Sequence, residues 1–237
     1  MTVASIPAVR PLAVNKPDSQ FAHVFIYAAM SRRLEFALPV KADTVPSGPD
    51  WFHEIKHDGY RMMIIRERDR VRLKTRGGFD WTDRYPWIVE TAVKLKPSQF
   101  VLDGEAVVLN VDGLSDFAAL QSRRYEDEVQ FYAFDMLAGD GDDFRRLPLS
   151  MRKTNLARLL WGRSEGVHAA PYEQGEIGPD LFRHACLIGL EGMVSKHRER
   201  AYGAGRCTHW IKVKNPNHPA YRRAQDQFQF NGRTRRR

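Results

Sequence analysis

A lysine followed by an Asp-Gly pair and an arginine is the first group of residues in this chain with the means to do chemistry. Residues 56–61 read KHDGYR. A lysine amine attacks phosphorus only when it is neutral, whereas an unperturbed lysine has a pKa near about 10.4. Burial and nearby cations both favour the neutral amine. Lys56, with Arg61 close by in the chain, is therefore a candidate nucleophile toward phosphorus.

Four more charged or aromatic clusters follow in the chain. They read DGE at residues 103–105, FYAFD at residues 131–135, EGMVSK at residues 191–196 and WIKVK at residues 210–214. Displacement at phosphorus depends on neutralising charge, so carboxylates that hold a metal and cations that hold phosphate should converge on the lysine. The candidate carboxylates are Glu105 and Glu191, and further candidate cations are Lys212 and Lys214.

In this order the clusters resemble the nucleotidyltransferase motifs of ATP-dependent DNA ligases, especially the ligase domain of bacterial end-joining ligases. The resemblance covers residues 38–215. It implies an α+β fold, the two-sheet antiparallel (ATP-grasp-like) nucleotidyltransferase fold of DNA ligases and capping enzymes. It also implies three displacements at one site. Lys56 takes AMP from ATP, AMP passes to a 5′-phosphate, and a 3′-hydroxyl displaces AMP to seal a nick in DNA repair or recombination.

The resemblance implies a role for each candidate residue at the nucleotide. Glu105 contacts the ribose and, together with Glu191, holds a Mg²⁺ ion that bridges to ATP. Phe134 stacks on the adenine ring, and the backbone near Glu54 reads the adenine edge. Composition alone would instead place Phe134 in the core, because most phenylalanines in such apolar runs are buried.

Cations are implied to hold the phosphates. Arg61 is expected near the ribose and phosphates, and Lys212 and Lys214 at the nucleotide phosphates. Arg76 lies in the run KTRGGFDWT at residues 74–82, which looks like the second ligase motif, and is expected to contact the nick phosphate of DNA. The two glycines of that run would let the backbone approach a phosphate closely.

The surrounding pattern predicts the elements that position these residues. Residues 51–55 read as a strand, so Lys56 would lie where that strand runs into an Asp58-Gly59 turn. Glu105 is expected to end an apolar strand at another Asp-Gly turn, and Glu191 to precede a strand that begins near Met193. Residues 212 and 214 alternate with apolar residues, which places both lysines on one face of a strand.

Further strands are expected at residues 62–66, 71–75, 100–109 and 129–136. Apolar residues at helical spacing predict helices over residues 85–93, after a Ser115 cap, from a Ser150 cap to Leu160, and over residues 180–188 with an end at Gly189. Residues 1–37 read as an irregular leader with three prolines, residues 38–215 as the adenylation domain, and residues 216–237 as a short basic tail.

Two other classes of function remain open. An RNA ligase or a capping-type nucleotidyltransferase would share the lysine motif and the phosphate lysines. A capping enzyme would be labelled by GTP, whereas a ligase would be labelled by ATP. A non-catalytic nucleotide- or DNA-binding module is the second alternative. The charged residues argue against it, because a protein that only binds has no need of a neutral lysine among cations.

Histidine and cysteine usage argues against a zinc site and a disulfide framework. His53 and His57 are four residues apart, but in a strand-and-turn pattern rather than on a helix. Cys207 and His209 lack a second pair at zinc-site spacing, and two cysteines in all indicate a reducing cytoplasm. The apolar residues 21–30 are too short to span a bilayer. We expect a cytoplasmic protein with no membrane partner.

The net charge of +8 is unevenly placed, since residues 222–237 hold six arginines and one aspartate. The expected partners are nicked or broken duplex DNA, with end-joining proteins or a separate DNA-binding subunit. Ligases of this type continue into an oligonucleotide-binding barrel, for which the 23 residues after Lys214 are too few. We therefore expect AMP transfer but poor unaided nick sealing, with much of the DNA affinity in the arginine tail.

Overall fold

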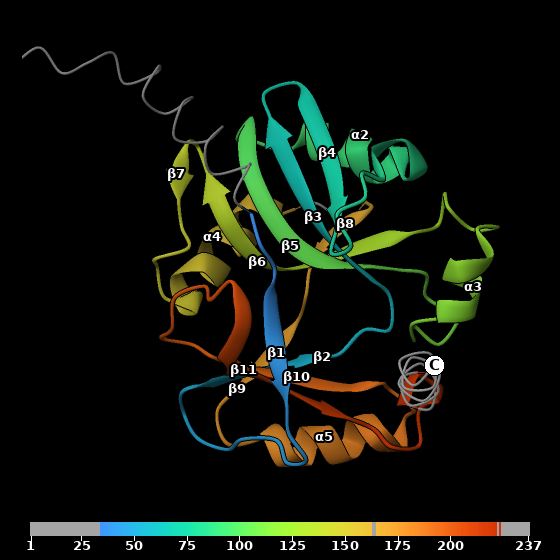
Figure 1. Cartoon of the computed structure of the whole chain (residues 1–237), viewed down its shortest axis with the longest axis vertical. Helices are drawn as coiled ribbons and strands as arrows, with labels where there is room; N and C mark the ends of the chain where they lie inside the picture. Colours follow the sequence, from blue (N-terminus) through green and yellow to red (C-terminus); the bar gives the residue numbers. More distant parts are fainter. Residues whose placement is uncertain (1–33, 163–164, 222, 224–237) are drawn as a thin grey trace, which may run out of the picture.

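The computed structural model describes residues 34–162, 165–221 and 223. Most of the expected leader, and the basic tail from residue 224 onward, lie outside these residues. The described chain forms two β-sheets with helices beside them, which confirms the predicted α+β two-sheet class. Figure 1 shows the six-stranded sheet in the upper half of the view and the five-stranded sheet in the lower half.

The five-stranded sheet contains the first two and the last three strands. Its order is β1 (Ala37–Lys41), β11 (Gly205–Lys214), β10 (Gly192–His197), β2 (Trp51–Ile55) and β9 (Tyr172–Gln174). Strands β1 and β11 run parallel, and the other neighbours are antiparallel. Helix α5 (Gly178–Leu187) packs against β10, below the sheet in Figure 1.

The six-stranded sheet is built from the middle of the chain. Its main order is β4 (Arg70–Thr75), β3 (Tyr60–Glu67), β5 (Gln99–Val107), β6 (Gln130–Gly139) and β7 (Asp142–Asp143), and β8 (Val167–Ala169) pairs in parallel with β6. Helix α4 (Leu149–Leu160) packs on β6 and β8, and α2 (Pro86–Lys94) packs on β4 and β3. The short elements η1 (Thr82–Arg84) and α3 (Phe117–Ser122) lie in connections.

The apolar run in β3 explains how the two sheets pack. Side chains alternate between the faces of a strand. Met62 and Ile64 face the core beneath the helices, whereas Met63 and Ile65 face a second core shared with Trp210 of the other sheet. All four side chains are at most 1% exposed, so the central strand is buried on both faces.

Several local expectations are confirmed. Strands cover residues 51–55, 71–75 and 210–214 as predicted, and helices cover most of residues 85–93, 150–160 and 180–188. The expected strand at residues 100–109 forms as β5, which ends at Val107, and the strand predicted at residues 129–136 forms as β6, which extends to Gly139. No helix among the described residues is long and apolar enough to cross a membrane.

Other expectations are wrong in detail. The sheets are not purely antiparallel, because β1 and β8 each join a parallel partner. The side chain of Asp116, not Ser115, caps α3 by accepting a bond from Ala119 N. Pro148 takes the N-cap position of α4 in place of Ser150.

Neither expected Asp-Gly turn forms. Strand β5 continues through Asp103 and Gly104 to Val107, and only its register against β6 shifts there, so Glu105 lies within a strand. After β2, the chain leaves the five-stranded sheet and enters the six-stranded sheet at Tyr60. Residues 56–59 are therefore a crossing between the sheets. Among the described residues, the return crossing is at residues 170–171, between β8 and β9.

Candidate active site

A cavity of about 420 Å³ lies between the sheets at the crossing that carries Lys56. Seven of the nine residues predicted for the site line it: Glu54, Lys56, Arg61, Arg76, Glu105, Phe134 and Lys212. The other two are Glu191 and Lys214, and Glu191 forms ion pairs with both Lys56 and Lys214. Residues from β2, β3, β5, β6, β10 and β11 therefore meet at one place, although they are far apart in sequence.

Lys56 is held at both its backbone and its amine. Its N–H donates to Gly192 O at 2.9 Å, and its Nζ donates to Glu191 Oε2 at 2.5 Å. The other oxygen of Glu191 lies 3.2 Å from Lys214 Nζ. The Glu191 side chain is only 4% exposed, whereas that of Lys56 is 23% exposed. One buried carboxylate thus orients two lysines, and the amine of Lys56 remains reachable from the cavity.

Gly59 is required at the far end of the crossing. A Cβ at this position would lie 2.2 Å from Ala106 O and 2.7 Å from a methyl group of Val107. The backbone oxygen cannot move aside without breaking β5. The glycine of the KHDGYR motif therefore lets the crossing pass directly over β5.

Glu105 is the carboxylate that lines the cavity itself. Burial raises its pKa to about 7, although Lys56 and Arg61 act in the opposite direction, and Glu191 raises it further. The described residues contain no group of three or more His, Cys, Asp or Glu side chains placed to hold a metal ion. Mg²⁺ commonly takes one or two carboxylates together with substrate phosphates. Two neighbouring carboxylates without a complete protein cage fit an ion that arrives with a nucleotide.

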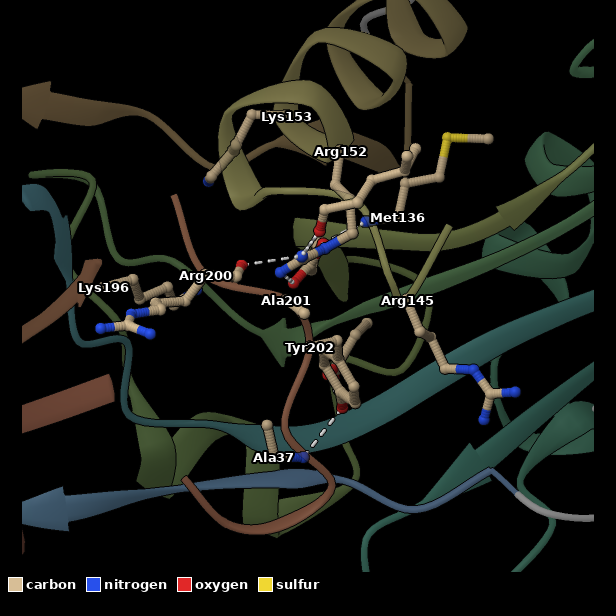
Figure 2. A network of polar contacts seen from close by, with 12 residues as sticks. Ala37, Met136, Arg145, Arg152, Lys153, Lys196, Arg200, Ala201 and Tyr202 are labelled. Carbon is tan, nitrogen blue, oxygen red and sulfur yellow. Dashed lines mark hydrogen bonds and ion pairs between the residues drawn. The ribbon is translucent and has the colours of Figure 1, made fainter. Parts of the chain in front are cut away.

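Arg61 is fixed by a fork-like pair that sequence reasoning missed. Its Nε and Nη2 donate to the two oxygens of Asp103 at 2.7 and 2.8 Å. Burial alone would lower the pKa of Arg61, but Asp103 raises it above the ordinary value. Tyr202 Oη also donates to Asp103 at 2.8 Å, and Ala37 N donates to Tyr202 Oη at 2.8 Å. Figure 2 shows the bond from Ala37 to Tyr202.

Phe134 borders the cavity at the edge of the second core. Lys196 Nζ lies 3.8 Å from its ring centroid, and Arg61 Cζ lies 4.5 Å away. The ring of Trp210 meets it edge-on at a centroid distance of 6.1 Å. The ring is only partly buried, so it combines a packing role with a surface open to a ligand.

The carboxylate of Glu54 is occupied by two buried lysines. Lys196 Nζ lies 2.5 Å from Oε2, and Lys153 Nζ of α4 lies 2.6 Å from Oε1. Burial would raise the pKa of Glu54, but the two lysines hold it below its usual value. Burial in turn lowers the pKa of Lys196 to about 8. Lys196 belongs to the EGMVSK motif, so the sequence marks it as a candidate. Lys153 has the sequence context of an ordinary exposed helix lysine, and no motif indicates its burial.

A second buried pair anchors α4 beside Phe134. Arg152 donates to both oxygens of Asp135 at 2.8 and 2.9 Å, and both side chains are fully buried. Its Nη1 also donates to the carbonyl oxygens of Leu147 and Arg200. Figure 2 shows Arg152 reaching from α4 toward Arg200 and Ala201. The pair therefore ties α4 and the segment before β11 to the strand that carries Phe134.

Arg76 and Lys212 lie on opposite walls. The N–H of Arg76 donates to Arg61 O at 3.0 Å, and the tight loop that follows contains Gly78 at φ +88°. A left-handed φ of this kind favours glycine. Burial lowers the pKa of Lys212, as do the neighbouring charges of Lys56 and Lys214. The phosphate cations expected from the sequence thus surround Lys56.

Comparison with known proteins agrees with this geometry. Residues 37–214 match the family model described as ATP dependent DNA ligase domain. The multifunctional non-homologous end joining protein LigD of Pseudomonas aeruginosa is 38% identical over 216 residues, which cover 89% of this chain and 24% of that protein. LigD of Mycobacterium tuberculosis is 36% identical over 169 residues, which cover 70% of this chain and 22% of that protein.

A solved structure of mycobacterial DNA ligase D complexed with ATP and MES superposes with a TM-score of 0.67 at 31% identity. The superposition covers 76% of this chain and 60% of that chain. This chain spans about a quarter of the length of the curated relatives named above. The family match extends over well more than half of the 237 residues, and the chain therefore belongs to the family of ATP-dependent DNA ligase domains.

Proposed function

We propose that this chain performs ATP-dependent nucleotidyl transfer to DNA, leading to the sealing of nicked or broken duplexes. The observation that carries the proposal is the position of Lys56. Its amine reaches a cavity that is also lined by Glu105, Arg61 and Lys212. Nucleophilic attack on the α-phosphorus of ATP requires three kinds of group: a lysine nucleophile, carboxylates and phosphate-binding cations.

In the first step, Lys56 Nζ bonds to the α-phosphorus and the bond to pyrophosphate breaks. Glu191 Oε2, already 2.5 Å from Nζ, is placed to receive the proton that the amine must lose. Lys212 and Lys214 stabilise the charge on the phosphates. The product is lysyl-AMP on Lys56, with pyrophosphate as the leaving group.

The rest of the nucleotide would occupy the remainder of the cavity. Phe134 supplies a ring face for adenine, the backbone near Glu54 supplies groups for the adenine edge, and Arg61 lies where the ribose and phosphates would be. Glu105 and Glu191 would hold Mg²⁺, which when bound neutralises charge on the phosphates. Glu105 would also contact the ribose of the bound nucleotide.

The later steps need a DNA end. AMP passes from Lys56 to a 5′-phosphate, and a 3′-hydroxyl then displaces AMP. Arg76, exposed on the loop beside the cavity, is proposed to contact the phosphate of the nick. The named relatives are end-joining proteins, which supports broken duplex DNA as substrate, and end-joining proteins or a separate DNA-binding subunit as partners. The two free cysteines support a cytoplasmic location.

The test is covalent labelling followed by transfer. The protein is incubated with α-labelled ATP and Mg²⁺, examined by mass spectrometry, and then given a nicked duplex. Wild type should gain one AMP and pass it to the DNA. Lys56→Ala should gain none while it keeps its fold, and Lys94→Ala, on the outer helix α2, should behave as wild type.

Two outcomes contradict the proposal. An AMP adduct on Lys56→Ala, under conditions where wild type acquires one, would show that another residue is the nucleophile. Labelling by GTP in place of ATP would support the capping-type alternative, and transfer to nicked RNA but not to nicked DNA would support an RNA ligase. A wild-type protein that binds ATP without any adduct would support the non-catalytic alternative.

A further inference from the structure

The side chain of His57 has no role in the steps above, although it adjoins the nucleophile. It lies in the four-residue crossing between the sheets and borders the same cavity as Lys56. Residue 56 is fixed to the five-stranded sheet by its bond to Gly192, and residue 59 lies against β5 of the other sheet. Between those ends, side chains can anchor the path of the chain, as Asp58 does through its ion pair with Arg223.

His57 makes contacts that fit such an anchor. Its Nδ1 shares a hydrogen bond of 3.1 Å with Ser115 Oγ, just before α3. Its ring lies 4.8 Å from the ring of Tyr132 on β6, at an interplanar angle of 30°. Tyr132 in turn stacks on His168 of β8 at 5.2 Å and 29°. His168 Nε2 is fixed by a 2.8 Å bond to Gln130 Oε1.

Three rings therefore form a column, His57–Tyr132–His168, from the crossing to the strand β8. Each layer comes from a different part of the six-stranded sheet or its connections. Aromatic rings packed in this way attract one another beyond the effect of the area they bury. The column thus links the crossing to β6 and β8 through successive ring contacts.

The charge of His57 suits a place beside Lys56. Burial lowers the pKa of His57 to about 4, and Lys56 lowers it as well, while Glu54 and Glu191 act in the opposite direction. The imidazole is therefore neutral at neutral pH. A neutral ring can stay packed beside the amine without a repulsive charge.

Resting on the proposed lysyl-AMP chemistry, we propose that His57 is a positioning residue, which through Ser115 and the ring column holds Lys56 in line with the α-phosphorus of ATP. Misplacement of a reacting atom by about 1 Å can cost about 10²-fold in rate. The expected effect of losing the anchor is therefore a loss of the chemical step, with little change in ATP affinity.

The experiment measures single-turnover formation of lysyl-AMP as a function of ATP concentration for wild type, His57→Ala, His57→Phe and Ser115→Ala. His57→Ala removes both the ring and the hydrogen bond and should lower the maximal rate by about 10²-fold, with the half-saturating ATP concentration nearly unchanged. His57→Phe keeps a ring to stack on Tyr132, and Ser115→Ala keeps the imidazole. Both variants should keep a maximal rate of lysyl-AMP formation much closer to that of wild type than His57→Ala does.

A control separates positioning from stability. Ile88→Ala in α2 leaves a cavity in the core of the six-stranded sheet, away from Lys56, and should lower thermal stability without changing the maximal rate of the folded protein. The inference is overturned if His57→Ala leaves the maximal rate unchanged and alters only thermal stability or only the half-saturating ATP concentration. If wild type itself forms no lysyl-AMP, the proposed function fails instead, so the two failures can be told apart.

Discussion

Lys56, the proposed nucleophile, is held in place by Glu191. The amine and the carboxylate are 2.5 Å apart, and the same carboxylate holds Lys214. Such a pair fixes the direction of the amine, since a free lysine would sample many rotamers. Removing one partner of a buried pair leaves an uncompensated charge, which is costly. Glu191 therefore helps to set the shape of the site, in addition to the chemical role proposed for it.

Phe134 offers a way to separate ligand binding from packing. Phe134→Ala should raise the ATP concentration needed for adenylation, because a ring face is lost from the cavity. A fully buried phenylalanine would cost about 3–5 kcal/mol of stability on truncation, and a partly buried ring should cost less. Denaturant unfolding without ATP, compared with the ATP dependence of lysyl-AMP formation, checks both. A collapse of stability with unchanged ATP dependence would assign Phe134 to the core alone.

The buried imidazole of His57 makes stability depend on pH. Its pKa falls from 6.5 in the unfolded chain to about 4 in the folded protein, so the unfolded state binds more protons between these values. Stability should be full above pH 6.5 and decline as the pH falls from 6.5 to about 4, by up to about 3 kcal/mol. Urea unfolding across this range should be flatter for His57→Phe, and an unchanged slope would contradict the assignment.

Tyr202 links the two sheets, beside a second link in which Arg61 Nη2 donates to Ala37 O. Its hydroxyl accepts a bond from Ala37 N of β1 and donates one to Asp103 of β5. It therefore connects both sheets to the carboxylate that orients Arg61.

Tyr202→Phe leaves a buried N–H without this partner and should cost about 1–3 kcal/mol. It should also loosen Arg61 and weaken the use of ATP. Thermal unfolding and the ATP dependence of adenylation measure the two effects. Tyr125→Phe, at an exposed tyrosine, is the matched control and should change neither. Full stability in Tyr202→Phe would show that water or another donor replaces the hydroxyl.

The elements that the sequence predicted are those with a clear period. Apolar and polar residues alternate in β4 and β11, and apolar residues have helical spacing in α2. These local patterns match the burial seen in the structure. The short strands β1 and β9 were missed because each is only a few residues long and gains its strand identity from a distant partner. The Asp-Gly pairs favour turns locally, and this local preference does not show which sheet the next strand joins.

The residues of the site also fall into two groups, those that the sequence indicates and those that only the fold reveals. Ordered motifs indicated the residues that line the cavity, because chemistry restricts their types. The partners that orient them were missed, since Asp103, Tyr202 and Lys153 have no distinctive spacing and their pairing depends on the fold. His57 lay within the leading motif, but its role depends on ring contacts with β6 that no local pattern reveals.

At the scale of the whole chain, charge is expected to govern DNA affinity. Residues 231–237 contain four arginines. If all four contact duplex phosphates, deleting them should reduce the slope of log affinity against log salt by about 3.6, from roughly 0.9 per contact. Binding measured over a salt series checks this, with self-adenylation expected to persist. An unchanged slope would place the DNA contacts elsewhere in the chain.

The two crossings between the sheets also set an order of assembly. All strands of the six-stranded sheet come from one stretch, residues 60–169, so its pairings are comparatively local. The five-stranded sheet must join β2 to β10, and the bond from Lys56 to Glu191 spans 135 residues. Closing longer loops costs more entropy, and such pairings form slowly. A chain emerging from the ribosome would therefore hold a nearly finished six-stranded sheet while Lys56, the proposed nucleophile, was still unanchored, and the site would be complete only when the last strands were made.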